Sequence, residues 1–188
     1  MPSPQLPPAA RAIAGATTDA VSAVRIMDVA AFDEAVARLA AAEPEQVRVV
    51  LAVVVRALLE DLHPDGVSSD DLLELIKSCA RTSIGWYPGV DIEVLVVVLT
   101  GALGVHEPDQ ELRRFSPLDV ARHAPLFIAE LLAVSQARQA RQARQARQVG
   151  QPEPTPNAAP AEELGRPLTD YFADAYLEIS RAELNELP

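Results

Sequence analysis

Cysteine and aromatic residues are scarce in this chain of 188 residues. The single cysteine, Cys79, excludes an intrachain disulfide and a cluster of thiolate metal ligands. Aromatic residues make up 4% of the chain, whereas hydrophobic residues make up 49%. The core must therefore be built from Leu, Val, Ile and Ala, with few large side chains such as Trp86 and Phe127. This composition favours packed helices.

Glycine-rich loops and long apolar runs are also missing. The eight glycines are scattered and none follows a strand pattern, which argues against a nucleotide-binding loop and predicts no cofactor. No run reaches the ~18 apolar residues of a membrane span. The first residues, "MPSPQLPPAARAIAG", carry prolines where a signal peptide needs an apolar stretch. Together with the lone thiol, these features predict a cytoplasmic protein.

Positive charge is in short supply, because the formal net charge is -11. Residues 25–134 carry 18 acidic against 9 basic side chains. An acidic surface repels phosphate backbones and anionic lipid headgroups. We therefore expect neither nucleic acid nor a membrane as a partner of this domain.

What the chain does contain predicts an all-α fold: a compact multi-helix bundle over residues 25–136. Apolar residues recur at helical spacing in successive segments, each preceded by a residue that favours a helix start. These expected N-caps and first helical positions are Asp28, Pro44, Ser68, Asp91, Ser116 and Pro117. The valine-rich segment 44–62 also permits a strand, but its length favours a helix. Pro125 should kink the last helix or begin a new one.

The two most apolar segments hint at an internal repeat. "VVLAVVVRALLEDLHPD" and "VLVVVLTGALGVHEPD" share an apolar run followed by His and Pro-Asp, displaced by about 44 residues, within the period range of helical repeats. Two stacked helical hairpins are therefore one possible arrangement of the bundle. Chance similarity between apolar helices that end in polar turns is the alternative.

The two ends of the chain differ from this central domain. Residues 1–24 contain four prolines and no sustained period, which predicts a disordered tail. Residues 149–166 are rich in proline and predict an extended linker. In residues 167–188 the apolar side chains share one helical face, formed by Leu168, Tyr171, Phe172, Ala175, Tyr176 and Ile179. We expect this amphipathic helix to pack on the helical domain, with exchange into a homodimer or binding to another protein as alternatives.

Four Gln-Ala-Arg triplets occupy "SQARQARQARQARQ" at residues 135–148. A three-residue step displaces each arginine by about 60° around a helix, so the four arginines form no single stripe. The tract has no aromatic side chain on which a base can stack. We predict a solvated helical extension at residues 137–148, with nucleic-acid binding through the Arg tract 138–147 as an alternative.

Histidines and carboxylates in two turns are the candidates for chemistry. His63 and Asp65 lie in one turn, and His106, Glu107 and Asp109 lie in the other. Imidazole and carboxylate groups are the ligands of zinc or iron, and a stacked repeat would bring the two turns together. The spacing matches no metal motif, however, and His-Pro-Asp-Gly is also an ordinary surface turn. For His123 we expect a place at a helix end, and for Cys79 a buried, inert thiol.

Trp86 and Tyr87 are the adjacent aromatic pair of the chain. Such pairs occur at binding hot spots, but beside a turn they more often close the end of a core. They are candidates for partner binding, together with Tyr171, Phe172 and Tyr176 of the C-terminal segment.

These features favour a non-enzymatic helical protein-interaction module, an adaptor or regulatory subunit in a bacterial-type cytoplasm. A metal-dependent enzyme that uses the His63 and His106 turns is one alternative. Nucleic-acid binding through the Arg tract is the other.

Overall fold

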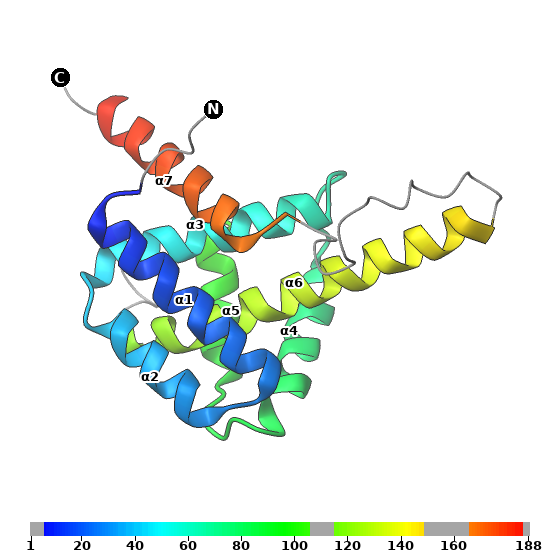
Figure 1. The fold of residues 1–188 in the computed structure, drawn as a ribbon, viewed down its shortest axis with the longest axis horizontal. Coiled ribbons are helices and arrows are strands. Elements are labelled where there is room, and N and C mark those ends of the chain that lie inside the picture. The colour runs from blue at the N-terminus through cyan, green and yellow to red at the C-terminus, as the bar shows by residue number, and fades with distance from the viewer. Residues whose placement is uncertain (1–5, 106–114, 149–165, 186–188) are drawn as a thin grey trace, which may run out of the picture.

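The computed structural model describes residues 6–105, 115–148 and 166–185. These residues form helices joined by turns and contain no strand, which confirms the predicted all-α fold (Figure 1). The strand alternative for residues 44–62 is therefore wrong. The helices of the described part are α1 (Pro8–Ile26), α2 (Val29–Ala40), α3 (Pro44–Leu62), α4 (Ser69–Ile84), α5 (Ile92–Ala102), α6 (Pro117–Gln148) and α7 (Leu168–Asn185).

The prediction of a disordered tail over residues 1–24 is wrong for residues 8–24, which form most of α1. The helical domain therefore begins well before residue 25. Pro8 stands in the first turn, where a missing N–H costs nothing. The buried side of α1 consists mainly of alanine, with Ile13 and Val21 as its large apolar side chains. Alanine is small, so the buried side of α1 offers few of the large apolar side chains by which a helical face is recognised in a sequence.

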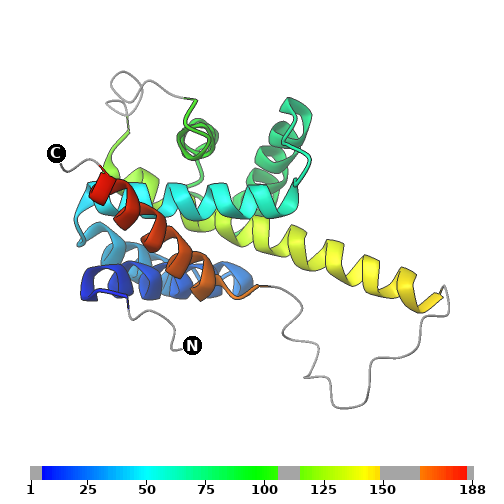
Figure 2. The ribbon, with the colours of Figure 1, turned by 90° about the horizontal axis from the view of Figure 1, so that it is seen from above.

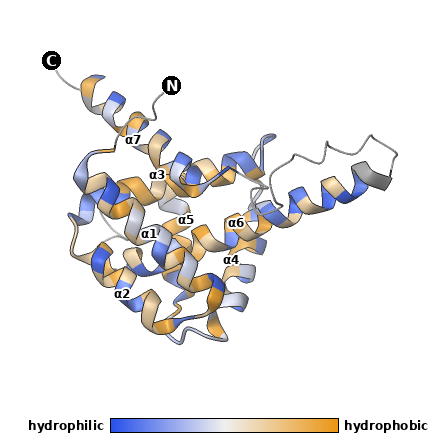
Figure 3. Cartoon of the chain, viewed as in Figure 1, coloured by the Kyte–Doolittle hydropathy of each residue, from blue (hydrophilic) through white to orange (hydrophobic). Residues whose placement is uncertain are grey.

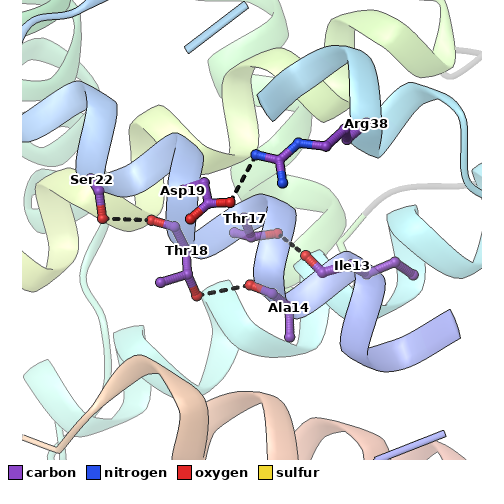
Figure 4. A network of polar contacts seen from close by, with 7 residues as sticks. All are labelled: Ile13, Ala14, Thr17, Thr18, Asp19, Ser22 and Arg38. Atoms are coloured by element: carbon purple, nitrogen blue, oxygen red, sulfur yellow. Dashed lines mark hydrogen bonds and ion pairs between the residues drawn. The ribbon is translucent and has the colours of Figure 1, made fainter. Parts of the chain in front are cut away.

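Hydroxyl groups on α1 are satisfied within the helix itself. Thr17, Thr18 and Ser22 each donate to the carbonyl four residues earlier, at 2.8 Å (Figure 4). Thr17 can therefore be fully buried without a partner from another helix. One ion pair, Arg38 to Asp19 at 2.8 Å, joins α2 to α1, and the two helices pack as a hairpin around the left-handed residue Met27.

The predicted helix starts are confirmed by hydrogen bonds. Asp28 accepts the Ala31 amide at 3.0 Å, and Asp91 accepts the Glu93 amide at 2.8 Å. Ser68 forms a capping box with Asp71. Ser116 and Asp119 make the same reciprocal contacts at the start of α6. Pro44 stands in the first turn of α3, as predicted. Each cap satisfies an amide that would otherwise lack a partner at the helix start.

Helix α6 lies at the centre of the bundle and packs against α1, α2, α3, α4 and α5. It continues through Pro125, which is buried, so the idea that Pro125 begins a new helix is wrong. Beyond the bundle α6 runs on through the triplets to Gln148 and projects away from the other helices in both views (Figures 1 and 2). The triplets of this projecting part repeat two hydrophilic residues and one alanine, whereas strongly apolar residues concentrate in the bundle (Figure 3).

Helix α7 lies across α3 and α1, on the outside of the bundle (Figure 2). The predicted linker 149–166 falls almost wholly outside the described residues. The second turn of the possible repeat, residues 106–109, also lies outside the described residues. The two helices that would begin the repeats differ in length, with 19 residues in α3 and 11 in α5. Within the described part, no helix combines the length and apolar character that crossing a bilayer requires.

The centre of the core generates a stability prediction. Leu51 on α3 and Leu131 on α6 are 1% and 0% exposed. Truncating either to alanine should lower the free energy of unfolding by about 2 to 5 kcal/mol, because a packed leucine leaves a cavity. Leu73→Ala is the matched control, since Leu73 is 49% exposed. Denaturant unfolding monitored by circular dichroism measures all three, and losses under about 0.5 kcal/mol at both core sites would refute this core.

Candidate functional site

The turn between α3 and α4 contains the first pair of predicted metal ligands. His63 ends α3, and its Nδ1 atom lies 3.8 Å from Asp71 Oδ2. Asp65 is exposed in the same turn. A polar cavity of about 490 Å³ opens between this turn and α6, where Ser135 and Arg138 line it.

The second pair, His106 and Asp109, lies outside the described residues, as does Glu107. The structure therefore does not bring the two predicted turns together or keep them apart. Among residues 6–105, 115–148 and 166–185, no three His, Cys, Asp or Glu side chains are placed to hold a metal ion.

Arg138, the first arginine of the triplets, faces this same turn. Its guanidinium donates to the carbonyl oxygen of Leu62 at the end of α3. A cation is favourable there, because the last carbonyls of a helix lack amide partners and carry partial negative charge. The first triplet is therefore part of the bundle, whereas Arg141 and Arg144 on the projecting part of α6 are exposed.

His123 is buried between α5 and α6, in the second turn of α6 and not at a helix end. Its Nε2 atom accepts the Asp91 amide at 2.8 Å, so Nδ1 carries the proton and donates to the Asp119 carbonyl at 2.8 Å. Burial lowers the pKa of the His123 imidazole, against smaller raising effects of the Asp119 carbonyl and of the Asp91 carboxylate. The neutral ring thus joins the start of α5 to α6, a structural role.

Cys79 lies on the buried side of α4 and is 0% exposed, as predicted. Burial raises the pKa of its thiol to about 12, and the nearby Glu130 carboxylate adds to the rise. A thiol with this pKa is protonated at neutral pH and is a poor nucleophile.

Trp86 and Tyr87 form an aromatic cluster with Phe32 of α2. The Phe32 ring lies 5.6 Å from the Trp86 ring and 4.9 Å from the Tyr87 ring, both edge to face. Tyr87 is buried and its hydroxyl contacts Asp33 at 3.3 Å, while Trp86 is half-buried. The pair closes the end of the core between α2 and the α4–α5 turn, and the half-buried Trp86 ring also remains a candidate for partner contact.

The remaining candidates, Tyr171, Phe172 and Tyr176, lie on α7. Tyr171 and Phe172 are 4% and 2% exposed, whereas Tyr176 is half-buried. The Tyr171 hydroxyl donates to Asp61 Oδ2 at 2.6 Å, and burial together with this carboxylate raises the pKa of the tyrosine. The Arg166 guanidinium lies over the Tyr171 ring, 4.4 Å from its centroid.

A second polar contact fixes the direction of α7. Arg56 of α3 pairs with Glu178. Residue numbers rise along α7 from Tyr171 to Glu178 while they fall along α3 from Asp61 to Arg56, so the two helices are antiparallel. We call the surface of α3 and α1 beneath α7, with Arg56 and Asp61 at its edge, the α1–α3 face.

Arg56 and Asp61 were not identified as functional candidates from the sequence. Their partners on α7 are more than a hundred residues away, and no local pattern links the two segments. The one local signal is Arg56 itself, a charged residue within the apolar run "VVVRALL".

The geometry of Cys79 predicts its reactivity. In the native protein a thiol reagent should label Cys79 only slowly, because the sulfur is both buried and protonated. The same reagent should label it at once in denaturant, which serves as the internal control. Rapid labelling of the native protein would contradict the burial of Cys79.

The geometry of His123 predicts a pH dependence of stability. Its lowered pKa means that the unfolded chain, with a histidine pKa near 6.5, binds the proton more readily than the folded chain. The neutral His123 ring therefore makes its full contribution to the free energy of unfolding above about pH 6.5. As the pH falls below this value the contribution is lost, by no more than about 1.4 kcal/mol per pH unit. Unfolding free energies at pH 7.5 and 5.5 should show the loss in the unaltered chain and in His63→Ala, but a smaller one in His123→Ala. An equal loss in all three would exclude His123 as its source.

Similarity to known proteins gives no functional assignment for this chain. The chain matches no protein-family model, no curated protein and no solved structure.

Proposed function

We propose that this chain is a non-enzymatic helical protein-interaction module, acting as an adaptor or regulatory subunit in a cytoplasmic setting. The observation that carries the proposal is the way α7 lies on the α1–α3 face. A helix joined to the bundle by residues 149–165 buries two adjacent aromatic side chains, Tyr171 and Phe172, against that face. Buried aromatic anchors on an amphipathic helix are the usual means by which one protein binds another through a helix.

The charge distribution also supports a protein partner. The net charge of -11 disfavours approach to nucleic acid, and the first arginine of the triplets is already engaged with Leu62. The His63 turn shows one carboxylate contact, to Asp71, and both groups belong to the end of α3 and the start of α4. The contact between His63 and Asp71 and the contact between Arg138 and Leu62 therefore have structural roles in the fold.

Isolation of the full chain from the cells that make it tests the proposed function. A tag at one terminus and purification under native conditions should recover a protein partner in a fixed ratio to the chain. The reason is that an adaptor is held in its complex by protein contacts.

Two other outcomes would contradict the proposal. One is a chain recovered alone with about one equivalent of zinc or iron that is lost in His63→Ala. The other is a chain recovered with nucleic acid that is released in the variant Arg141→Ala, Arg144→Ala. Glu34→Ala is the matched surface control, since Glu34 is exposed on α2 and lies in neither candidate region.

A further inference from the structure

The α1–α3 face makes three kinds of contact with the helix that lies on it. It accommodates two adjacent aromatic side chains, Tyr171 and Phe172. It offers a carboxylate, Asp61, to the first aromatic hydroxyl. It also offers a cation, Arg56, to a carboxylate seven residues further along, Glu178. Because these contacts stand at different places along the antiparallel helices, they specify direction and register as well as composition.

Arg56 is the selective element among these contacts. Residues 168–185 carry more acidic than basic side chains, and the domain beneath them is also acidic, so overall charge does not explain why α7 lies here. The favourable charge contact from the domain is the guanidinium of Arg56, whose side chain is 37% exposed and also lies 3.9 Å from Glu60. Another helix that binds this face with a carboxylate at the position of Glu178 can form the same ion pair with Arg56.

The two halves of α7 differ in how far their side chains are buried. Tyr171, Phe172 and Ala175 in its first half are buried. From Tyr176 onward its described side chains are half-buried or exposed, and Leu184 is 68% exposed. Few buried side chains must therefore offset the ordering of an 18-residue helix. A helix that makes further apolar contacts beyond this point has an advantage over α7.

Apolar surface for such contacts exists on α3. Val49 and Val53 lie two turns and one turn before Arg56, in the direction that an antiparallel helix takes, and both are half-buried. The α7 of a second copy brings the same contacts as the resident helix and so gains nothing over it. The tether gives the resident helix an effective concentration of order mM, so exchange between copies needs protein concentrations of that order. A helix from another protein is not limited to the contacts of α7.

We propose that the α1–α3 face recognises an acidic amphipathic helix of another protein, and that α7 is the intramolecular ligand which this helix displaces. The inference rests on the proposed function and names the surface and the partner chemistry. The partner helix runs antiparallel to α3, buries two adjacent aromatic side chains and places a carboxylate seven residues after the first of them.

A labelled peptide of residues 166–185 is the probe for this face, standing in for the partner helix. It is titrated by fluorescence anisotropy against two full-length proteins, the unaltered chain and the variant Tyr171→Ala, Phe172→Ala, whose own α7 has lost its anchors. We expect the peptide to bind the variant at least about tenfold more tightly, because the tethered helix no longer competes.

A charge exchange tests whether Arg56 recognises the carboxylate at the position of Glu178. The Glu178→Arg peptide should bind the double variant about fivefold more weakly, the scale of a partly exposed ion pair, and should recover when the variant also carries Arg56→Glu. Arg48→Glu is the matched control. Arg48 lies on the same helix but pairs with Glu45, so this change should give no recovery. If the double variant loses its cooperative melt, the single variant Phe172→Ala replaces it as the chain with a weakened α7, since Phe172 is 2% exposed and lies outside the ion pair.

Three results of these peptide titrations would overturn the inference. They are no saturable binding to the altered chain up to ~1 mM peptide, equal affinity for both chains, and failure of Arg56→Glu to restore the Glu178→Arg peptide. Dimers of the unaltered chain at about 10 to 100 µM, seen by light scattering, would also overturn it and make a second copy the occupant. A native partner recovered together with a peptide that does not bind would refute this inference and leave the proposed function standing.

Discussion

The packing of α6 against α1, α2, α3, α4 and α5 is the constraint on which the rest of the structure depends. In a core with few aromatic residues, helices must approach closely to fill space, and the small side chains along α1 and α6 permit this. Phe127, in the part of α6 that lies within the bundle, is fully buried. Since α6 packs against α1, α2, α3, α4 and α5, its direction and register set where these helices lie.

Polar groups near α6 follow from this central position, because a buried polar atom needs a partner from whichever helix it faces. His123 joins α6 to the start of α5, and Glu130 accepts hydroxyl groups from Ser78 and Thr82 of α4 at 2.6 and 3.1 Å. Arg138 reaches the end of α3. Each contact ties α6 to a different neighbour, so together they select one arrangement among the many that an aliphatic core alone would tolerate.

Local signals in the sequence were sufficient for most helices and insufficient for the contacts between them. Caps such as Ser68 and Asp91 act within a few residues, so their effect is readable directly. Helix α1 is harder to predict because four prolines lie at or before its start and its buried side is mostly alanine, with few large apolar side chains to mark it. The pairing of Asp61 with Tyr171 depends on the tertiary fold, and the chemistry proposed for the His106 turn lies in residues that the structure does not describe.

From the contacts of the first triplet we expect the number of triplets to have little bearing on how α7 lies. Arg138 contacts Leu62 and Tyr171 contacts Asp61, so both segments are fixed near the same end of α3. From Arg138 to Gln148 the helix adds about 15 Å. A flexible chain of the length of the linker predicted for residues 149–166 would span roughly 20 to 25 Å on average, enough to return. One triplet more or fewer moves the end of α6 by about 4.5 Å and turns it by about 60°, a change that such a linker absorbs. A repetitive tract at this position can therefore vary in length without disturbing either contact.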